Sequence, residues 1–190
     1  MPNWCSGYLI VRGKPKNIEN FCKLFIFSNE DTDETFKKKK YFARSFIHYT
    51  WKNFKKEFLD NKHEEIDFYV DFAWSGWSCL IDGYPQQYKK EGCVTLEWAC
   101  KKYDVEVTIE TEEWGMGFEE LIKADKNGVN YDTKDMPTCI CKNCGEKRQI
   151  PSSLNYETEE CYECGKIGFT LFDEVIGEIK KDMGKITIIE

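Results

Sequence analysis

Histidine and the motifs of common catalytic sites are almost absent from this sequence. The chain of 190 residues contains two histidines, His48 and His63, and no G-x-S-x-G, Walker, G-x-G-x-x-G or H-E-x-x-H pattern. Neighbouring acids such as Glu112 and Glu113 would point to opposite sides of a strand, which disfavours a catalytic carboxylate pair. A nucleophilic pair of Cys79 with His48 has no specific pattern behind it. We therefore expect a protein that is not an enzyme.

Long apolar runs are also missing. No stretch of about 18 apolar residues occurs, so we expect no membrane-spanning helix and no membrane partner. Residues 1–13 (MPNWCSGYLIVRG) lack the basic segment and apolar stretch of a secretory signal, so we expect the chain in the cytoplasm, where thiols stay reduced. Five of the ten cysteines stand among apolar residues and are expected to be buried thiols: Cys5, Cys22, Cys79, Cys93 and Cys100.

Positive charge is in deficit. Lys and Arg number 27 against 34 Asp and Glu, which gives a formal net charge of −7. This balance disfavours nonspecific binding to DNA or anionic membranes and suits a partner protein with a basic surface. The charges are segregated, because residues 37–56 contain eight Lys or Arg and no acid, while residues 104–120 contain seven acids and no base. Aromatic residues interleave the basic run, which leaves a contact with nucleic acid open, although we expect most of them in the core.

Two C-x-x-C-G patterns stand out among the remaining cysteines. Cys141 and Cys144 form the first, and Cys161 and Cys164 form the second, with sixteen residues between them. This spacing lets both sulfurs of each pair face one tetrahedral ion, and four thiolates select zinc over magnesium or calcium. We expect one zinc ion bound by these four cysteines. Cys139 lies two residues before Cys141 and is the alternative ligand at that position.

The predicted zinc site is structural. Four cysteine ligands leave no coordination position open for water or substrate. Residues 139–170 contain four Lys or Arg against five Glu, and a zinc ion with four thiolates adds two negative charges. Nucleic acid is therefore not expected as a direct partner of this zinc ribbon, and a zinc-ribbon accessory protein that binds nucleic acid is the alternative function.

The remaining periodicity predicts an α+β fold. Residues 104–113 alternate most cleanly, and Asn127-Gly128 marks a hairpin. Further strands are predicted over 5–12, 42–49, 66–74, 118–124 and 129–131, with helices capped by Asn17 and Thr95 and another ending at Leu59. We expect an antiparallel sheet with helices on one face over residues 1–133. Residues 134–190 are expected to form the zinc ribbon and a C-terminal β-hairpin tail, after a linker over residues 132–138.

The acidic strand offers a contact surface for a partner. Alternation places Glu106, Glu110 and Glu112 on one side of the strand, opposite its valines and isoleucine. We expect these three carboxylates to bind a basic surface of a host protein.

The first residues resemble a known family. Residues 1–5 (MPNWC), followed by an apolar strand and Gly13, are similar to the start of the Api-type ferredoxin-like proteins of phages and plasmids. Residues 114–118 (WGMGF) are similar to an aromatic-glycine stretch late in those proteins. The chain differs at Ser6-Gly7, where an asparagine is usual, and in the added ribbon and tail. The resemblance covers residues 1–131 and implies a ferredoxin-like fold, an origin in a mobile element and a bacterial host. It brings no catalytic residues.

Together these features predict an inhibitor of a host defence machinery. Small acidic proteins of mobile elements often bind host proteins, and CRISPR effectors carry a positively charged channel for nucleic acid. We expect an anti-CRISPR protein that acts on a Cas effector such as Cas9.

Overall fold

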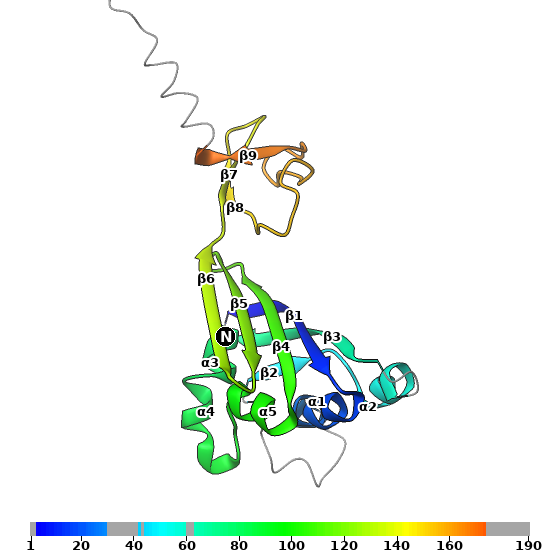
Figure 1. Cartoon of the computed structure of the whole chain (residues 1–190). Coiled ribbons are helices and arrows are strands. Elements are labelled where there is room, and N and C mark those ends of the chain that lie inside the picture. The colour runs from blue at the N-terminus through cyan, green and yellow to red at the C-terminus, as the bar shows by residue number, and fades with distance from the viewer. Residues whose placement is uncertain (1–2, 30–41, 43, 60–62, 174–190) are drawn as a thin grey trace, which may run out of the picture. The chain divides into compact units, whose positions relative to one another are not determined.

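The chain divides into two compact units, residues 1–134 and residues 135–190 (Figure 1). The computed structural model describes residues 3–29, 42, 44–59 and 63–173. Within the part so described, no helix is long and apolar enough to cross a membrane.

The N-terminal unit is built on a six-stranded sheet. Its strands, in chain order, are β1 (Trp4–Gly13), β2 (Ser45–Ile47), β3 (Glu65–Ala73), β4 (Val105–Glu113), β5 (Phe118–Asp125) and β6 (Gly128–Asp135). In space they follow the order β2-β3-β1-β4-β5-β6, and β1 pairs antiparallel with both β3 and β4. The sheet therefore joins strands that lie far apart in the sequence around β1 at its centre.

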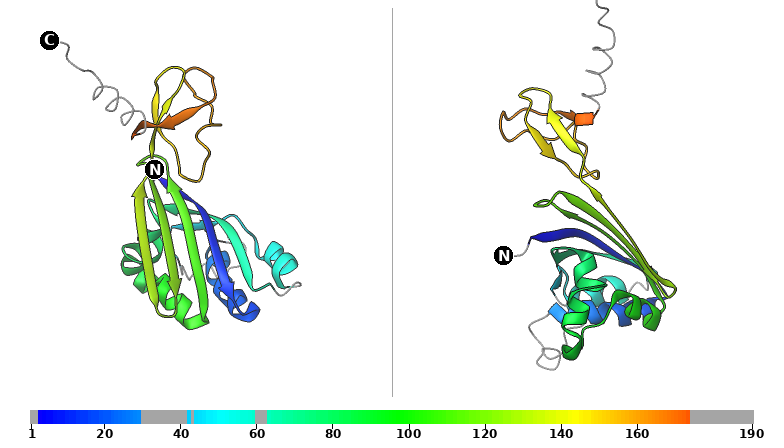
Figure 2. Two further views of the ribbon diagram at one scale, coloured as in Figure 1. Left: turned by 45° about the horizontal axis from the view of Figure 1, so that its top comes forward. Right: turned by 90° about the vertical axis from the view of Figure 1, so that its left-hand side faces the viewer.

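Helices cover one face of this sheet (Figure 2, right). They are α1 (Pro15–Asn29), α2 (Trp51–Phe54), a π-helical turn η1 (Lys55–Leu59), α3 (Gly76–Leu80), α4 (Tyr84–Gln87), a 3-10 turn η2 (Lys89–Glu91) and α5 (Leu96–Tyr103). Thr95 caps α5 as predicted, because its hydroxyl accepts a hydrogen bond from the backbone N–H of Trp98 at 3.2 Å. The predicted cap at Asn17 is wrong, since α1 begins at Pro15, a residue that suits the first helical turn.

The core lies between the sheet and these helices. Along β4, Val105, Val107 and Ile109 are buried, and Leu9 and Val11 of β1 pack beside them. Each such side chain contributes about 1.5–3 kcal/mol on burial. All five cysteines predicted to be buried thiols are buried. The alternation of apolar and polar residues over 104–113 therefore places the apolar side chains of β4 in the core.

Gly7 allows β1 and β4 to approach each other closely. A Cβ atom at this position would lie 2.0 Å from the backbone oxygen of Glu110. No side chain fits at that distance, so glycine is the residue that this point of the strand pair requires.

A buried carboxylate fastens α3 to the sheet. Glu120 of β5 is 3% exposed and accepts hydrogen bonds from the backbone N–H of Gly76 at 2.7 Å, the Thr111 hydroxyl at 3.2 Å and the Tyr131 hydroxyl at 3.1 Å. The Cys5 thiol lies 3.3 Å from the same carboxylate, and its pKa is raised well above the ordinary value by burial and by the charge of Glu120. No local sequence pattern predicts this network.

The C-terminal unit has a sheet of three short strands. These are β7 (Thr138–Cys141), β8 (Lys147–Gln149) and β9 (Phe169–Leu171), in the order β8-β7-β9. Among the described residues, the core of this unit has five buried members, of which three are cysteines: Cys139, Cys141, Ile150, Cys161 and Phe169. So few apolar side chains are a weak basis for independent stability.

Several predictions of local structure need correction. The segment 74–77, read as a turn, leads into α3, which the Ser75 side chain caps by accepting from the backbone N–H of Ser78 at 3.0 Å. The linker expected over 132–138 is largely strand, because β6 runs to Asp135 and β7 begins at Thr138. The second strand of the predicted tail lies outside the described residues, as do residues 37–41 of the basic run.

Candidate metal centre

The first C-x-x-C-G pattern folds into a tight turn at the end of β7. The backbone N–H of Cys141 donates to the oxygen of Glu146 at 2.8 Å, and the N–H of Gly145 returns to the oxygen of Cys141 at 3.0 Å. The N–H of Asn143 points at the Cys141 sulfur at 3.5 Å. Gly145 has φ 77°, the left-handed conformation that glycine adopts without strain.

The second pattern repeats the same backbone hydrogen bonds. The N–H of Cys161 donates to the oxygen of Lys166 at 2.9 Å, and the N–H of Gly165 donates to the oxygen of Cys161 at 2.8 Å. Gly165 has φ 66°. Both glycines therefore stand where a positive φ is needed to bring two sulfurs of one turn to the same side.

The four sulfurs converge on one point. All lie within 4.8 Å of one another, and the Sγ–Sγ distances are 3.8 Å between Cys141 and Cys164 and 3.7 Å between Cys144 and Cys161. A tetrahedral ion with metal–sulfur bonds of about 2.3 Å would hold its ligand sulfurs about 3.8 Å apart. The cluster thus has the size and donor set of a four-thiolate metal site, and these cysteines are positioned to bind a metal ion.

The negative charge of several thiolates in one cluster favours the binding of a cation. The backbone N–H groups of Asn143 and Cys144 lower the pKa of Cys141 to about 6. The pKa of Cys144 rises to about 12: the Glu146 backbone N–H opposes the rise, but desolvation and the sulfurs of Cys164, Cys141 and Cys161 outweigh it. Because the raised pKa of Cys144 keeps that thiol protonated until a cation offsets the negative charge beside it, metal binding and loss of a proton are coupled here.

Cys139 is not part of the cluster. Its side chain is fully buried in the small core, and its sulfur lies 3.9 Å from the backbone oxygen of Pro137. Cys141, and not Cys139, brings its sulfur to the other three. The alternative ligand considered from the sequence therefore lies elsewhere in the unit.

The acidic strand is β4, and its outward carboxylates lie on the face of the sheet opposite the helices. Glu106 and Glu110 are exposed and Glu112 is half-buried, while Glu113 on the other side of β4 is buried. Glu113 instead accepts from the backbone N–H groups of Gly115, at 3.0 Å, and of Met116. The structure thus brings the three predicted contact carboxylates to one open surface.

Large aromatic side chains share this open face. They come from β1, β2 and β3 and are each about half exposed: Trp4 43%, Tyr8 54%, Phe46 45% and Tyr69 46%. The expectation that the aromatics of residues 37–56 lie mostly in the core holds for Phe42 and is wrong for Phe46. The alternation of residues 4–8 could have revealed Trp4 and Tyr8, but both sides of that strand read as apolar.

One histidine also lies on the open face. His48 Nε2 is 2.5 Å from an oxygen of Asp71, whose other oxygen accepts from the Ser6 hydroxyl at 2.5 Å. Cys79, the other half of the nucleophilic pair considered above, is buried and donates to the backbone oxygens of Ala73 and Arg44 at 3.4 Å. Burial raises the pKa of Cys79 to about 12.

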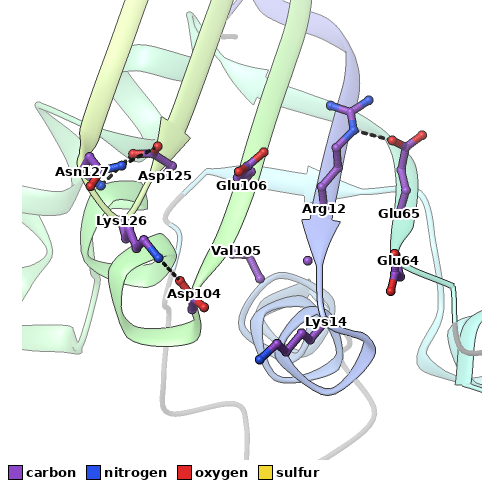
Figure 3. A pocket seen from close by; sticks show the side chains of 11 residues that line it. Arg12, Lys14, Glu64, Glu65, Asp104, Val105, Glu106, Asp125, Lys126 and Asn127 are labelled. Atoms are coloured by element: carbon purple, nitrogen blue, oxygen red, sulfur yellow. Dashed lines mark hydrogen bonds and ion pairs between the residues drawn. The ribbon is translucent and has the colours of Figure 1, made fainter.

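A hollow at one end of the sheet is lined by charged residues of both signs (Figure 3). Lys126 contacts Asp104 at 3.1 Å, and Arg12 pairs with Glu65. Asp125 accepts from the backbone N–H of its own hairpin turn. Four of the charged side chains that line the hollow are thus engaged in ion pairs with one another.

No family model, curated protein or solved structure matches this chain. The metal centre and the open face are therefore interpreted from their own chemistry.

Proposed function

We propose that this protein is a non-catalytic zinc-binding protein of phage or other mobile-element origin that binds and inhibits a host defence machinery. More specifically, we propose an anti-CRISPR protein that acts in the bacterial cytoplasm on a Cas effector such as Cas9. The observation that carries the proposal is the acidic face of the sheet, because a row of carboxylates over which the described residues place no helix suits a basic channel for nucleic acid.

The metal is proposed to be one structural zinc ion. Four thiolates with tetrahedral spacing favour zinc among the divalent ions, and four cysteine ligands would fill a tetrahedral ion and leave no position for substrate. The bound ion would contribute folding free energy to this unit, whose described apolar core is small.

The strand order supports a ferredoxin-like N-terminal domain. That fold alternates strands and helices as βαββαβ. Here β1, α1, β2, β3, the helices α3 to α5 and β4 follow in that sequence, with β1 and β3 at the centre of the four strands. The pair β5 and β6 and the short α2 would be additions to the fold.

The alternative, a zinc-ribbon protein that binds nucleic acid, has less support. Residues 135–173 contain four Lys or Arg and seven Asp or Glu, and a bound zinc with four thiolates adds further negative charge. Phosphate contacts need the opposite sign.

A charge-reversal variant tests the acidic face. Replacing Glu106, Glu110 and Glu112 by Lys should leave the fold intact, since all three point away from the core. We expect the variant to bind its partner at least about tenfold more weakly, or about 1.4 kcal/mol, with a smaller difference at high salt. Affinity capture from bacterial lysates, with and without expressed Cas9, supplies the partner, and titration at two salt concentrations measures the affinity.

The control variant carries the same change in net charge elsewhere. Glu57, Glu91 and Glu97 are exposed on the helical segments η1, η2 and α5, and their replacement by Lys should leave binding unchanged. Equal affinity of both variants, each well folded, would remove the acidic face from the function.

A further inference from the structure

Two pairs of aromatic side chains lie on the open face of the sheet. Trp4 and Phe46 meet edge to face with ring centroids 5.3 Å apart, and Tyr8 and Tyr69 do the same at 5.6 Å. Tyr8 and Tyr69 are direct partners across β1 and β3, whereas Trp4 of β1 and Phe46 of β2 meet across β3, which lies between their strands. We refer to these four residues as the aromatic strip. Large rings left half exposed on one face of a sheet indicate a contact site.

Carboxylates border the aromatic strip. Glu110 is the direct partner of Tyr8 on β4, and Asp71 of β3 is the direct partner of Phe46 on β2. Directly opposite residues hold their Cβ atoms about 4.5–5.5 Å apart, so one ligand group can touch a ring and a carboxylate together. The strip is thus a surface of π faces with negative charge at its margin.

This combination matches the chemistry of a guanidinium group. Arginine lies flat on an aromatic ring while its planar fork of N–H groups donates to a carboxylate. A lysine ammonium is more strongly hydrated and cannot stack, so it gains less from the same surface. Charge alone would attract both residues equally, whereas rings beside carboxylates favour arginine.

Single-stranded nucleic acid is the other ligand that stacks on exposed aromatics of a sheet. Its phosphates require cations beside the rings. The outward positions of β1, β3, β4 and β5 carry more acids than bases: Glu65, Asp67, Asp71, Glu106, Glu110, Glu112 and Glu119 against Arg12 and Lys123. Arg12 is moreover paired with Glu65. The charge of the face therefore favours a protein ligand over a nucleic acid.

We infer that the open face binds an arginine-rich segment of the partner protein, with the aromatic strip stacking on guanidinium groups and Glu110 accepting their hydrogen bonds. This assignment rests on the proposed function, namely a partner with a basic surface, and names the side chain by which that partner is recognised.

Matched peptides test the assignment on the full-length zinc-loaded protein. The probes are a short Gly/Ser peptide carrying four arginines, the same peptide carrying four lysines, and a single-stranded oligouridine. We expect the arginine peptide to bind at least about fivefold more tightly than the lysine peptide, and the oligouridine to bind more weakly than either. Equal affinity of the two peptides, or preference for the oligouridine, would overturn the assignment.

Variants locate the site. The double variant Tyr8→Ala/Tyr69→Ala removes two half-exposed rings and should weaken the arginine peptide about tenfold, while leaving the lysine peptide nearly unaffected. The control is Trp98→Ala on α5, which removes a ring of similar exposure from the helical layer and should change neither. Circular dichroism and heteronuclear NMR spectra confirm folding, and in a well-folded double variant an unchanged affinity for the arginine peptide overturns the assignment.

The experiments distinguish failure of the arginine assignment from failure of the proposed function. If the tyrosine variant binds the captured partner normally while the Glu106, Glu110 and Glu112 reversal abolishes binding, the arginine assignment is wrong and the proposed function stands. If neither variant affects the partner, both are wrong.

Discussion

At the scale of single residues, the metal centre depends on which four cysteines supply the sulfur ligands. Cys161 brings its sulfur to 3.7 Å from that of Cys144, while Cys139 keeps its sulfur in the small core. Two cysteines of one strand, two residues apart, therefore have different roles: Cys141 belongs to the cluster and Cys139 to the packing.

Replacing Cys161 by Ser should remove the metal. The purified wild-type protein should contain about one zinc per chain, and the Cys161→Ser variant should contain far less, because a hydroxyl is a poor ligand for an ion held by three thiolates. The control Cys139→Ser should retain zinc, with at most a loss of stability from its buried hydroxyl. Elemental analysis after gel filtration measures both, and full occupancy in Cys161→Ser together with loss in Cys139→Ser would reverse the ligand assignment.

At the scale of elements, the attachment of α3 depends on the Glu120 carboxylate. Replacing Glu120 by Gln introduces an amide NH₂ group where N–H and O–H donors already converge, so some of these donors lose their acceptor. We expect the N-terminal unit to lose about 1–3 kcal/mol of its free energy of unfolding, measured by urea denaturation. Lys123→Gln, at an exposed outward position of the same strand, should cost less than about 0.5 kcal/mol, and equal losses would contradict a special role for Glu120.

The elements also show what could be predicted from the sequence. The strand over residues 104–113 and the paired C-x-x-C-G turns were predictable, because their signals are local: a period of two and a fixed ligand spacing. The helix α3 was missed because its N-terminus depends on Glu120, which lies 44 residues away. The exposure of Phe46 could not be predicted from the sequence. It depends on which face of the sheet the helices cover, and that is a property of the assembled sheet.

At the scale of the whole molecule, the chain is two units with different sources of stability. The N-terminal unit has a large apolar core, whereas the described residues of the C-terminal unit include a core of five buried residues, of which three are cysteines. A chelator should therefore unfold residues 135–173 and leave the N-terminal sheet folded. Amide hydrogen exchange before and after addition of EDTA measures this residue by residue. Loss of protection in both units together would show that they fold as one.

The position of β6 bears on how the protein avoids association with itself. As the outermost strand of the six, β6 presents backbone N–H and C=O groups to which a strand from another molecule could add. Its second half carries exposed side chains of both charges, Asp132, Lys134 and Asp135. Charged side chains along an edge strand disfavour the addition of strands from other molecules, so we expect this edge to resist edge-to-edge aggregation.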